Sequence, residues 1–414
     1  MIRALVGNEI TFTNPLAPEF LNLAIKFKDS KYVEKSVRNF QKLFVGLRTK
    51  VENGYFVKTS EAPVLKLPSY IQDCQSACDW ITNNHLPKIH KNMATLAAND
   101  HITVISSSHS LSDGGYCIRA MEHSLDDDIH VTGFPMSIAT AFSRELSSAE
   151  KNKPNPFPYK SCSHFIKNPF DPHLAPKGIK SINILDTISA NELKCYDSIK
   201  KRPKNLTETL MAALSISFNA YGDRPNSPLG LPVIIDLRRF TKSHVDWRYG
   251  NCVAHPNMGI TQHSNSTLNE ILKMFKDEIK RNQTDGIFYA VNHNPYPGEP
   301  YHIYCSLSNI GPIKVKSPII DFYIHSQSDE SKEFHLNGAA SGSSFCLISF
   351  SKVFDNRNII YNQWRYQPAL MNRKAFEVLR NSVTYFMKNI PMDAKFNDVY
   401  KEIKGYQEKV EREF

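Results

Sequence analysis

A histidine and a carboxylate stand four residues apart on a short glycine-rich segment. His109 opens this segment, and Asp113 is followed directly by Gly114 and Gly115. A neutral imidazole, whose pKa is ordinarily about 6.5, can take a proton from an alcohol or an amine that attacks a carbonyl carbon. The pattern predicts that His109 is a general base and that Asp113 orients the loop. Because the chain has 15 histidines, the residues alone leave open a surface loop in which Asp113 and Gly114 only make a turn.

The elements around this segment would hold it rigidly. Four of the residues in 102–106 are β-branched, which is typical of a short buried strand, and the apolar spacing from Gly115 to Leu125 predicts a helix. A loop between a buried strand and a helix keeps catalytic side chains fixed and accessible. We expect the two glycines to let the backbone bend there.

Other elements follow from apolar spacing, turn residues and capping patterns. We expect helices over residues 30–47, 71–96 with a break at Pro87, 136–146, 207–221 with Gly222 in the left-handed conformation at its end, 267–279 behind a Thr267–Glu270 capping box, and 376–386. We expect strands over residues 232–237, 301–307, 344–350 and 358–363. Each half of the chain therefore mixes helices and strands.

Prolines concentrate between residues 153 and 178, where they would interrupt both helices and central strands. We take this stretch as a linker between an N-terminal lobe, residues 1–175, and a C-terminal lobe, residues 176–414. The fold class predicted is α/β, of the α+β sandwich type. The cleft between two lobes is the expected place for a ligand.

The composition excludes several classes of protein. With 41% hydrophobic and 22% charged residues the chain is globular, and its net charge of +9 is scattered rather than gathered in the basic stripe of a nucleic-acid-binding face. The eight cysteines mostly lie in apolar runs, which indicates buried thiols and no metal site. No signal peptide and no membrane-spanning stretch is evident. We expect a cytoplasmic monomer.

The segment His109-x-x-x-Asp113-Gly114 resembles the signature of the CoA-dependent acyltransferase superfamily, which includes chloramphenicol acetyltransferases and condensation domains. Further along, Asp236-Leu237-Arg238 and Gly250-Asn251 are similar to a strand and a turn of condensation-like members, and Ser308-Asn309-Ile310-Gly311 to a strand of the fungal alcohol or amine acetyltransferase branch. The aromatic-glycine string near the end of the plant branch is absent.

The resemblance implies a fold of two chloramphenicol-acetyltransferase-like lobes, each a mixed sheet flanked by helices, with a channel between them. His109 would be the base midway along that channel, and Asp113 would be structural and paired with a cation, for which Arg238 is the candidate. A solvated Arg238 is the alternative.

An acyl-transfer site also needs a donor for the oxygen that gains charge and a place for the cofactor. Ser306 and Ser308 are candidates for the donor, although both could instead satisfy backbone groups at a strand end. Gly114 and Gly115 are candidates for cofactor binding at the loop. The cofactor implied is acetyl-CoA or another acyl-CoA, used as a co-substrate and without a metal.

The function predicted is transfer of an acyl group from a thioester to a hydroxyl or amine of a small hydrophobic acceptor, without a covalent acyl-enzyme. One alternative is a condensation-type domain that takes its acyl group from a carrier protein. Another is an inactive homologue that binds a ligand or partner. An intact His109 and Asp113 favour an enzyme.

Overall fold

The computed structural model describes residues 2–14, 18–154, 162–163, 165–167, 181–240, 246–248, 250–282, 285–293, 302–328, 345–354, 357–368 and 370–414. The chain forms two compact units. Unit 1 consists of Met1–Ser143, Thr241–Cys252 and Ile313–Asp329, and unit 2 of Arg144–Phe240, Val253–Pro312 and Glu330–Phe414. The units are thus built from interleaved segments, whereas the sequence suggested a contiguous division at residues 175 and 176, which lie outside the described residues.

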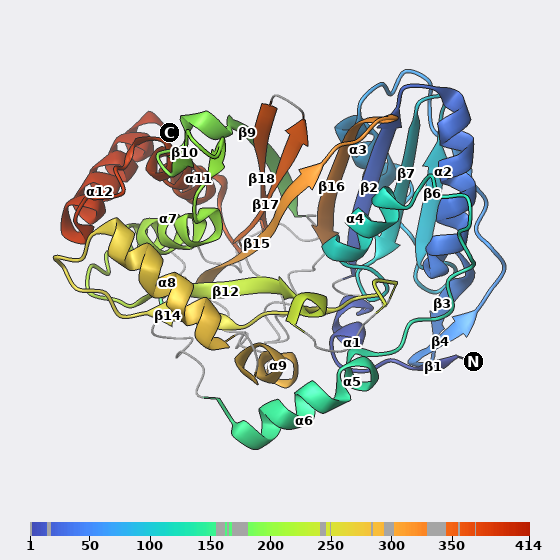
Figure 1. Cartoon of the computed structure of the whole chain (residues 1–414), viewed down its shortest axis with the longest axis horizontal. Coiled ribbons are helices and arrows are strands. Elements are labelled where there is room, and N and C mark those ends of the chain that lie inside the picture. The colour runs from blue at the N-terminus through green and yellow to red at the C-terminus, as the bar shows by residue number, and fades with distance from the viewer. Residues whose placement is uncertain are drawn as a thin grey trace. The chain divides into compact units, whose positions relative to one another are not determined.

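A five-stranded mixed sheet forms the centre of unit 1, in the order β16-β2-β7-β6-β5. Its strands are β2 (Glu19–Phe27), β5 (Leu65–Lys66), β6 (Ala94–Ala98), β7 (Ile102–Ser108) and β16 (Ile319–Ser328). Figure 1 shows β7 next to β2, with β16 on the other side of β2. Every residue of β7 is buried. The strand that leads to His109 is therefore held on both sides by neighbours.

A small three-stranded sheet in the order β1-β4-β3 completes the strands of unit 1. It contains β1 (Arg3–Ala4), β3 (Thr49–Glu52) and β4 (Tyr55–Lys58). The N-terminal residues are thereby fixed on unit 1, since Arg3 pairs with Phe56 of β4.

The helices of unit 1 are α1 (Asn8–Phe12), α2 (Ser30–Leu43), the 3-10 helix η1 (Val45–Arg48), α3 (Cys74–Asn84), α4 (Gly114–Glu122) and α5 (Ile138–Ala141). The five-stranded sheet is contacted by α2, η1, α3 and α4. Helix α2 packs on β6 and β7 with Val33 and Phe40 buried. Helix α3 packs on β2, β7 and β16. Burial of these apolar faces is the main force that holds such layers together.

Unit 2 contains an eight-stranded mixed sheet. Its path is β13-β12-β15-β17-β18-β9, with β14 also on β12 and β8 also on β15. The strands are β8 (Phe165–Lys167), β9 (Ile182–Ser189), β12 (Leu229–Asp236), β13 (Val253–Ala254), β14 (Asn257–Ile260), β15 (His302–Lys314), β17 (Phe345–Phe354) and β18 (Arg357–Tyr366). Strands β12 and β15 run parallel, and the other registered pairs are antiparallel. A two-stranded ribbon joins β10 (Tyr196–Asp197) to β11 (Arg202–Pro203).

A buried helix forms the core of unit 2. The helices of this unit are α6 (Ser143–Asn152), η4 (Ala190–Glu192), α7 (Leu206–Tyr221), η5 (Leu237–Phe240), α8 (Leu268–Asn282), α9 (Asp285–Asn292), α11 (Arg373–Asn389) and α12 (Phe396–Glu413). Helix α7 is buried without interruption from Thr209 to Ala220, and it packs on α8, α11, α12 and β12. A helix that is buried on all sides must be surrounded by other elements, as α7 is.

Several predictions from the sequence are confirmed. The fold is mixed α/β, with helices against mixed sheets. The strand before His109 and the helix after it are β7 and α4. The Thr267–Glu270 capping box is present, since the Thr267 N–H donates to Glu270 Oε2 at 2.8 Å and the Glu270 N–H to Thr267 Oγ1 at 3.3 Å.

Three expected helices need correction. The helix expected over residues 71–96 is only Cys74–Asn84, and Leu96 lies in strand β6, because a short apolar run suits a buried strand as well as a helix. The helix expected over residues 136–146 is divided at Phe142 into α5 and α6. Gly222 has a φ of −82° and is not left-handed; the left-handed residue is Asp223, at 52°.

Close packing, rather than backbone conformation, explains why residue 222 is a glycine. A Cβ at this position would lie 2.7 Å from Cγ2 of Ile166, so only glycine lets β8 approach the end of α7. Most of the proline-rich segment proposed as a linker lies outside the described residues.

All eight cysteines are buried free thiols. Among the residues with described placement, no helix is long and apolar enough to span a bilayer.

Candidate functional site

The loop that carries His109 begins where β7 leaves the sheet. The His109 N–H donates to the Glu19 carbonyl at 2.8 Å, which continues the pairing with β2 by one residue. The Leu111 N–H then donates back to the Ser108 carbonyl at 3.0 Å and closes a tight turn. His109 is half-buried, whereas its neighbours Ser108 and Ser110 are buried. The turn thus presents one side chain, the imidazole, from an otherwise buried loop.

The serines of this loop serve the turn itself. The hydroxyls of Ser108 and Ser110 lie 2.9 Å apart, and the Ser112 hydroxyl donates to the Ser108 carbonyl at 3.2 Å. Hydroxyls bonded to neighbouring groups in this way stabilise local backbone structure. They fix the conformation in which His109 leaves the strand.

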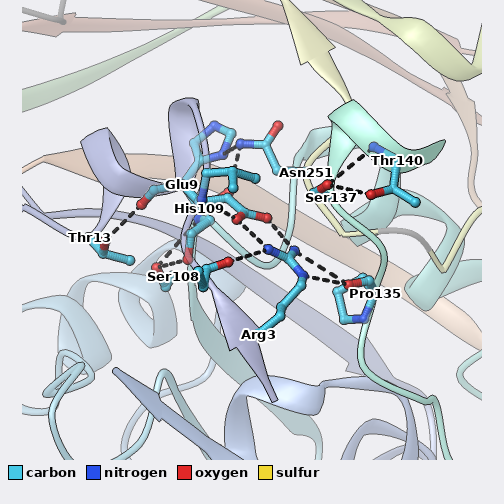
Figure 2. Close-up of polar contacts among 12 residues, drawn as sticks. Arg3, Glu9, Thr13, Ser108, His109, Pro135, Ser137, Thr140 and Asn251 are labelled. Atoms are coloured by element: carbon cyan, nitrogen blue, oxygen red, sulfur yellow. Dashed lines mark hydrogen bonds and ion pairs between the residues drawn. The ribbon is translucent and has the colours of Figure 1, made fainter. Parts of the chain in front are cut away.

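The imidazole of His109 is held on its edge by Asn251. The side-chain nitrogen Nδ2 of Asn251 lies 3.1 Å from His109 Nδ1 and donates to the His109 carbonyl at 2.8 Å, as Figure 2 shows. Asn251 is 8% exposed. One buried amide therefore contacts both the ring and the backbone of the same histidine, which fixes its side-chain rotamer.

The face of the imidazole is covered by Phe12. The two rings are stacked, with centroids 4.4 Å apart and planes inclined by 7°. Such aromatic pairs contribute about 0.5–1.5 kcal/mol beyond the area they bury. Phe12 therefore fixes the plane of the ring, while Asn251 contacts its edge.

Helix α1, which carries Phe12, is anchored by an ion pair. Arg3 donates to both carboxylate oxygens of Glu9, with Nη1 to Oε2 at 2.6 Å and Nη2 to Oε1 at 2.5 Å. Arg3 also donates to the Pro135 carbonyl at 3.4 Å, so that strand β1, helix α1 and the segment before α5 are joined in unit 1 (Figure 2). The bidentate pair restricts where Phe12 can lie.

Asp113 is fully buried and connects two segments. Its Oδ1 accepts from the Tyr116 N–H at 2.7 Å and so caps the N-terminus of α4. Its Oδ2 accepts from the Cys252 N–H at 2.6 Å. The carboxylate thus holds the turn that carries Asn251 against the loop that carries His109. The loop-orienting role of Asp113 stays a prediction.

The approach of the Asn251 turn requires a glycine. A Cβ on Gly250 would lie 2.7 Å from the Leu111 carbonyl oxygen, which is closer than real Cβ contacts. Just before this turn, Trp247 stacks on His123 at the end of α4, with centroids 5.0 Å apart and planes inclined by 10°. The segment is therefore packed along α4 and the His109 loop.

Gly114 and Gly115 are the first two residues of α4. Neither has a positive φ, and the helix begins at Gly114, directly after the Asp113 N-cap. Both are half-buried. Their assignment to cofactor binding stays a prediction.

Three predicted residues lie in unit 2. Ser306 and Ser308 are two residues apart on β15 and so share a face of the strand; Ser306 is buried, and Ser308 is paired with Ile234 of β12. Arg238 donates through Nη1 to Asp236 at 2.9 Å. The contacts described within each unit do not test a pairing of Arg238 with Asp113, so that pairing and the serine roles stay predictions.

Two buried thiols of unit 2 are poor nucleophiles. Burial raises the pKa of Cys305, which precedes Ser306, well above its ordinary value, and burial raises the pKa of Cys162 to about 12. A thiol with a raised pKa is not ionised near neutral pH and does not attack a thioester. Among the described residues, no three His, Cys, Asp or Glu side chains are grouped so that they could hold a metal ion.

Sequence reasoning missed two residues of this arrangement. Asn251 stood in a turn noted only for its resemblance to condensation-like proteins, with no contact to His109 inferred. Phe12 carried no signal, because no local pattern relates it to a loop almost a hundred residues later.

No family model matches the sequence, and no curated protein matches it. Solved structures do match over almost the whole chain. Polyketide synthase associated protein 5 from Mycobacterium tuberculosis matches with a TM-score of 0.63 and 10% identity, covering 94% of this chain and 98% of that one. The starter condensation domain of rhizomide synthetase RzmA, as a variant in complex with C8-CoA, matches with a TM-score of 0.60 and 11% identity, covering 92% and 91%.

The epimerization domain of the third module of tyrocidine synthetase B also matches, with a TM-score of 0.58, 9% identity and coverage of 95% and 93%. At this identity the likeness establishes the fold. The predicted condensation-like fold is thereby confirmed, whereas the fungal acetyltransferase branch is not among these matches and stays a prediction.

Proposed function

We propose that this protein transfers an acyl group from a thioester, acyl-CoA, to a hydroxyl or amine of a small hydrophobic acceptor, with His109 at the reacting centre. The fungal alcohol or amine acetyltransferase branch is the proposed relationship, and acetyl-CoA is the simplest donor. No covalent acyl-enzyme is required. The monomeric state and cytoplasmic location expected from the sequence remain predictions.

The observation that carries this proposal is how firmly the His109 imidazole is held. Asn251 contacts its edge, Phe12 covers one face, and the Asp113 carboxylate joins the loop to the Asn251 turn. Nε2, by contrast, has no hydrogen-bond partner among the described residues. A surface histidine would not be fixed by three separate elements while one nitrogen is left for a reactant.

The reaction balances without a further reactant. The acceptor oxygen or nitrogen forms a bond to the acyl carbon, the carbon–sulfur bond breaks, and the acceptor's proton ends on the sulfur of the released thiol. A histidine can assist as a base, by taking the acceptor's proton, or as a donor, by placing an N–H on the oxygen that gains charge. The sequence predicts the base.

The donor class is supported by the fold and by charge. One of the similar structures contains C8-CoA, and a net charge of +9 suits an anionic cofactor. The similar condensation and epimerization domains belong to synthetases, which favours a carrier-protein thioester as the second candidate donor. An inactive ligand-binding homologue is the third candidate.

Thiol release would test the proposal. Acetyl-CoA, octanoyl-CoA and an acyl-pantetheine, as a mimic of a carrier arm, would be offered with a panel of amines and alcohols. We expect acceptor-dependent release that His109→Ala lowers by at least about a hundredfold. The matched control is His101→Ala, because His101 is exposed in the turn at the other end of β7.

Each outcome separates the candidates. Release with acyl-pantetheine but not with either acyl-CoA would favour the carrier-protein donor. Equal release by wild type and His109→Ala would remove His109 from the mechanism. Absence of release with every pair, despite binding of acyl-CoA, would favour the ligand-binding homologue.

A further inference from the structure

The side-chain nitrogen of Asn251 lies within hydrogen-bonding distance of two atoms of His109. It is 2.8 Å from the backbone carbonyl oxygen and 3.1 Å from ring nitrogen Nδ1 (Figure 2). An NH2 group has two hydrogens and can donate to both atoms at once. Asn251 thus uses both of its donors on one histidine.

The carbonyl contact fixes which way the Asn251 amide points. A backbone carbonyl oxygen can only accept a hydrogen bond, so the amide atom 2.8 Å from it must be the NH2. The flipped amide would place two acceptor oxygens at this distance, which is repulsive. The assignment of nitrogen and oxygen, usually ambiguous for asparagine, is therefore settled here by an independent contact.

This orientation decides where the neutral imidazole carries its proton. Because the NH2 of Asn251 donates toward Nδ1, Nδ1 must offer its lone pair, and the single proton of the neutral ring belongs on Nε2. A proton on Nδ1 would face the N–H of the amide. Phe12 adds to this restraint, since the stacked rings keep the imidazole in the plane in which Asn251 meets its edge.

We propose that Asn251 is a positioning residue that holds neutral His109 in the tautomer with its proton on Nε2. This inference rests on the proposed function for its catalytic meaning. In this tautomer His109 meets the reactants with an N–H, and it stabilises the oxygen that gains charge as the acceptor attacks the thioester. The lone pair that a base would use is bonded to Asn251.

The proton balance follows from this assignment. The acceptor's heteroatom forms its bond to the acyl carbon, and the carbon–sulfur bond breaks. The acceptor's proton passes to the departing sulfur, directly or through solvent, because Nε2 already carries a proton. The general-base role predicted from the sequence would require the other tautomer, which Asn251 disfavours.

Nitrogen NMR of the full chain labelled with 15N-histidine tests the tautomer directly. His109→Gln identifies the His109 signals by their disappearance, and spectra are recorded at a pH where the ring is neutral. We expect the Nε2 signal to be that of an N–H nitrogen and the Nδ1 signal that of a nitrogen with a lone pair, with the favoured tautomer at about tenfold excess or more. A protonated Nδ1 in the wild type would overturn the inference.

Asn251→Asp gives the opposite arrangement. A carboxylate can only accept, so it favours a proton on Nδ1 and repels the His109 carbonyl oxygen to which the amide donated. We expect the excess of the Nε2–H form to be lost. Asn251→Ala removes the restraint without adding a charge, and we expect a smaller excess of the Nε2–H form. Unchanged signals in both variants would overturn the role of Asn251.

The control is Asn99→Asp, in the turn at the opposite end of β7. Asn99 also uses its NH2 on two carbonyls, those of Pro68 and Ile71 at 3.3 and 3.0 Å, so the substitution removes the same kind of contact about 20 Å away along the strand. We expect its His109 signals to match the wild type.

The tautomer and the proposed function can fail separately. The spectra require no turnover, so the expected signals without any thiol release would contradict acyl transfer and leave Asn251 as a positioning residue. Thiol release that depends on His109, together with a proton on Nδ1, would support acyl transfer and return His109 to the role of base.

Discussion

The carboxylate of Asp113 accepts a hydrogen bond from the backbone N–H of Cys252, with 2.6 Å between Oδ2 and the nitrogen. The two residues lie 139 positions apart in the chain. Through this bond the carboxylate that caps α4 also holds the turn that brings Asn251 to His109. Stability and the geometry of the candidate site therefore depend on the same side chain.

Substitution of Asp113 should reduce both the stability of the protein and the activity of the candidate site. Asp113→Ala leaves the N–H groups of Tyr116 and Cys252 buried without their acceptor, and each such loss costs about 1–3 kcal/mol. We expect the free energy of unfolding to fall by about 2–4 kcal/mol in urea titrations, with loss of acyl transfer. Asp73→Ala, which removes an exposed cap from α3, should cost only about 1 kcal/mol. Equal losses would contradict a connecting role for Asp113.

Gly250→Ala tests the close approach of the Asn251 turn. The added Cβ would meet the Leu111 carbonyl at 2.7 Å, and relief of the overlap must move one segment away from the other. We expect a destabilisation of about 1–3 kcal/mol and a larger proportional loss of activity, measured on protein shown by circular dichroism to be folded. Wild-type activity would mean that the turn can shift without disturbing His109.

Phe12→Ala should loosen the imidazole. Loss of the stacked partner removes about 0.5–1.5 kcal/mol of orientation energy, so we expect kcat to fall about two- to tenfold with little change in KM. Phe12→Leu retains much of the buried area without the flat ring and serves as the comparison. If both variants keep full kcat, the stack has no catalytic consequence.

Asp73 should make stability depend on pH on the acid side. Partial burial raises the pKa of this carboxyl, but hydrogen bonds from the Ser76 side chain and from the backbone of Ser76 and Gln75 outweigh it, and the pKa lies below the ordinary 3.8. A lowered folded-state pKa means that the ionised group stabilises the fold above the unfolded-state pKa, about 3.9, and that this contribution is lost as pH falls through the folded value.

The measurement is the difference in unfolding free energy between wild type and Asp73→Asn from pH 7 to pH 3. We expect a constant difference above about pH 5 and a decrease below about pH 4. Asparagine keeps a side-chain oxygen for the cap, so it isolates the charge. A difference that grows as the pH falls would contradict the assigned direction.

Gly405→Ala should stabilise the protein. Gly405 lies inside α12 with no atom within 4 Å of the position that its Cβ would take. Alanine in a helix interior is favoured over glycine by about 0.5–1 kcal/mol. We expect a higher melting temperature in calorimetry and unchanged activity. A lower one would show that α12 bends or packs at this point in a way that needs glycine.

The sequence by itself determined the parts of the site that depend on local rules. The strand before His109, the loop with Asp113 and the helix after it follow from apolar periodicity and turn residues within some twenty positions. The sequence also predicted the Thr267–Glu270 capping box, because its two hydrogen bonds join residues three apart. Local hydrogen bonds and side-chain spacing depend only on the types of neighbouring residues, so the sequence predicts them.

Local patterns were less decisive where two structures satisfy them equally. Leu96 was assigned to a helix and lies in a strand, because its pairing with Ile105 of β7 depends on a neighbouring strand rather than on its own segment. Strand β16 pairs with β2 along its length although the two come from opposite halves of the chain. No spacing rule predicts which distant strands become neighbours.

Only the tertiary structure decided what surrounds the imidazole. Phe12 and Asn251 come from segments far before and after His109, and they meet it because strand pairing, the Asp113 bond to Cys252 and the close approach at Gly250 bring backbones together. The sequence identified the histidine that could do chemistry. The contact with Asn251, and with it the nitrogen that carries the proton, depends on packing between segments, which no local pattern encodes.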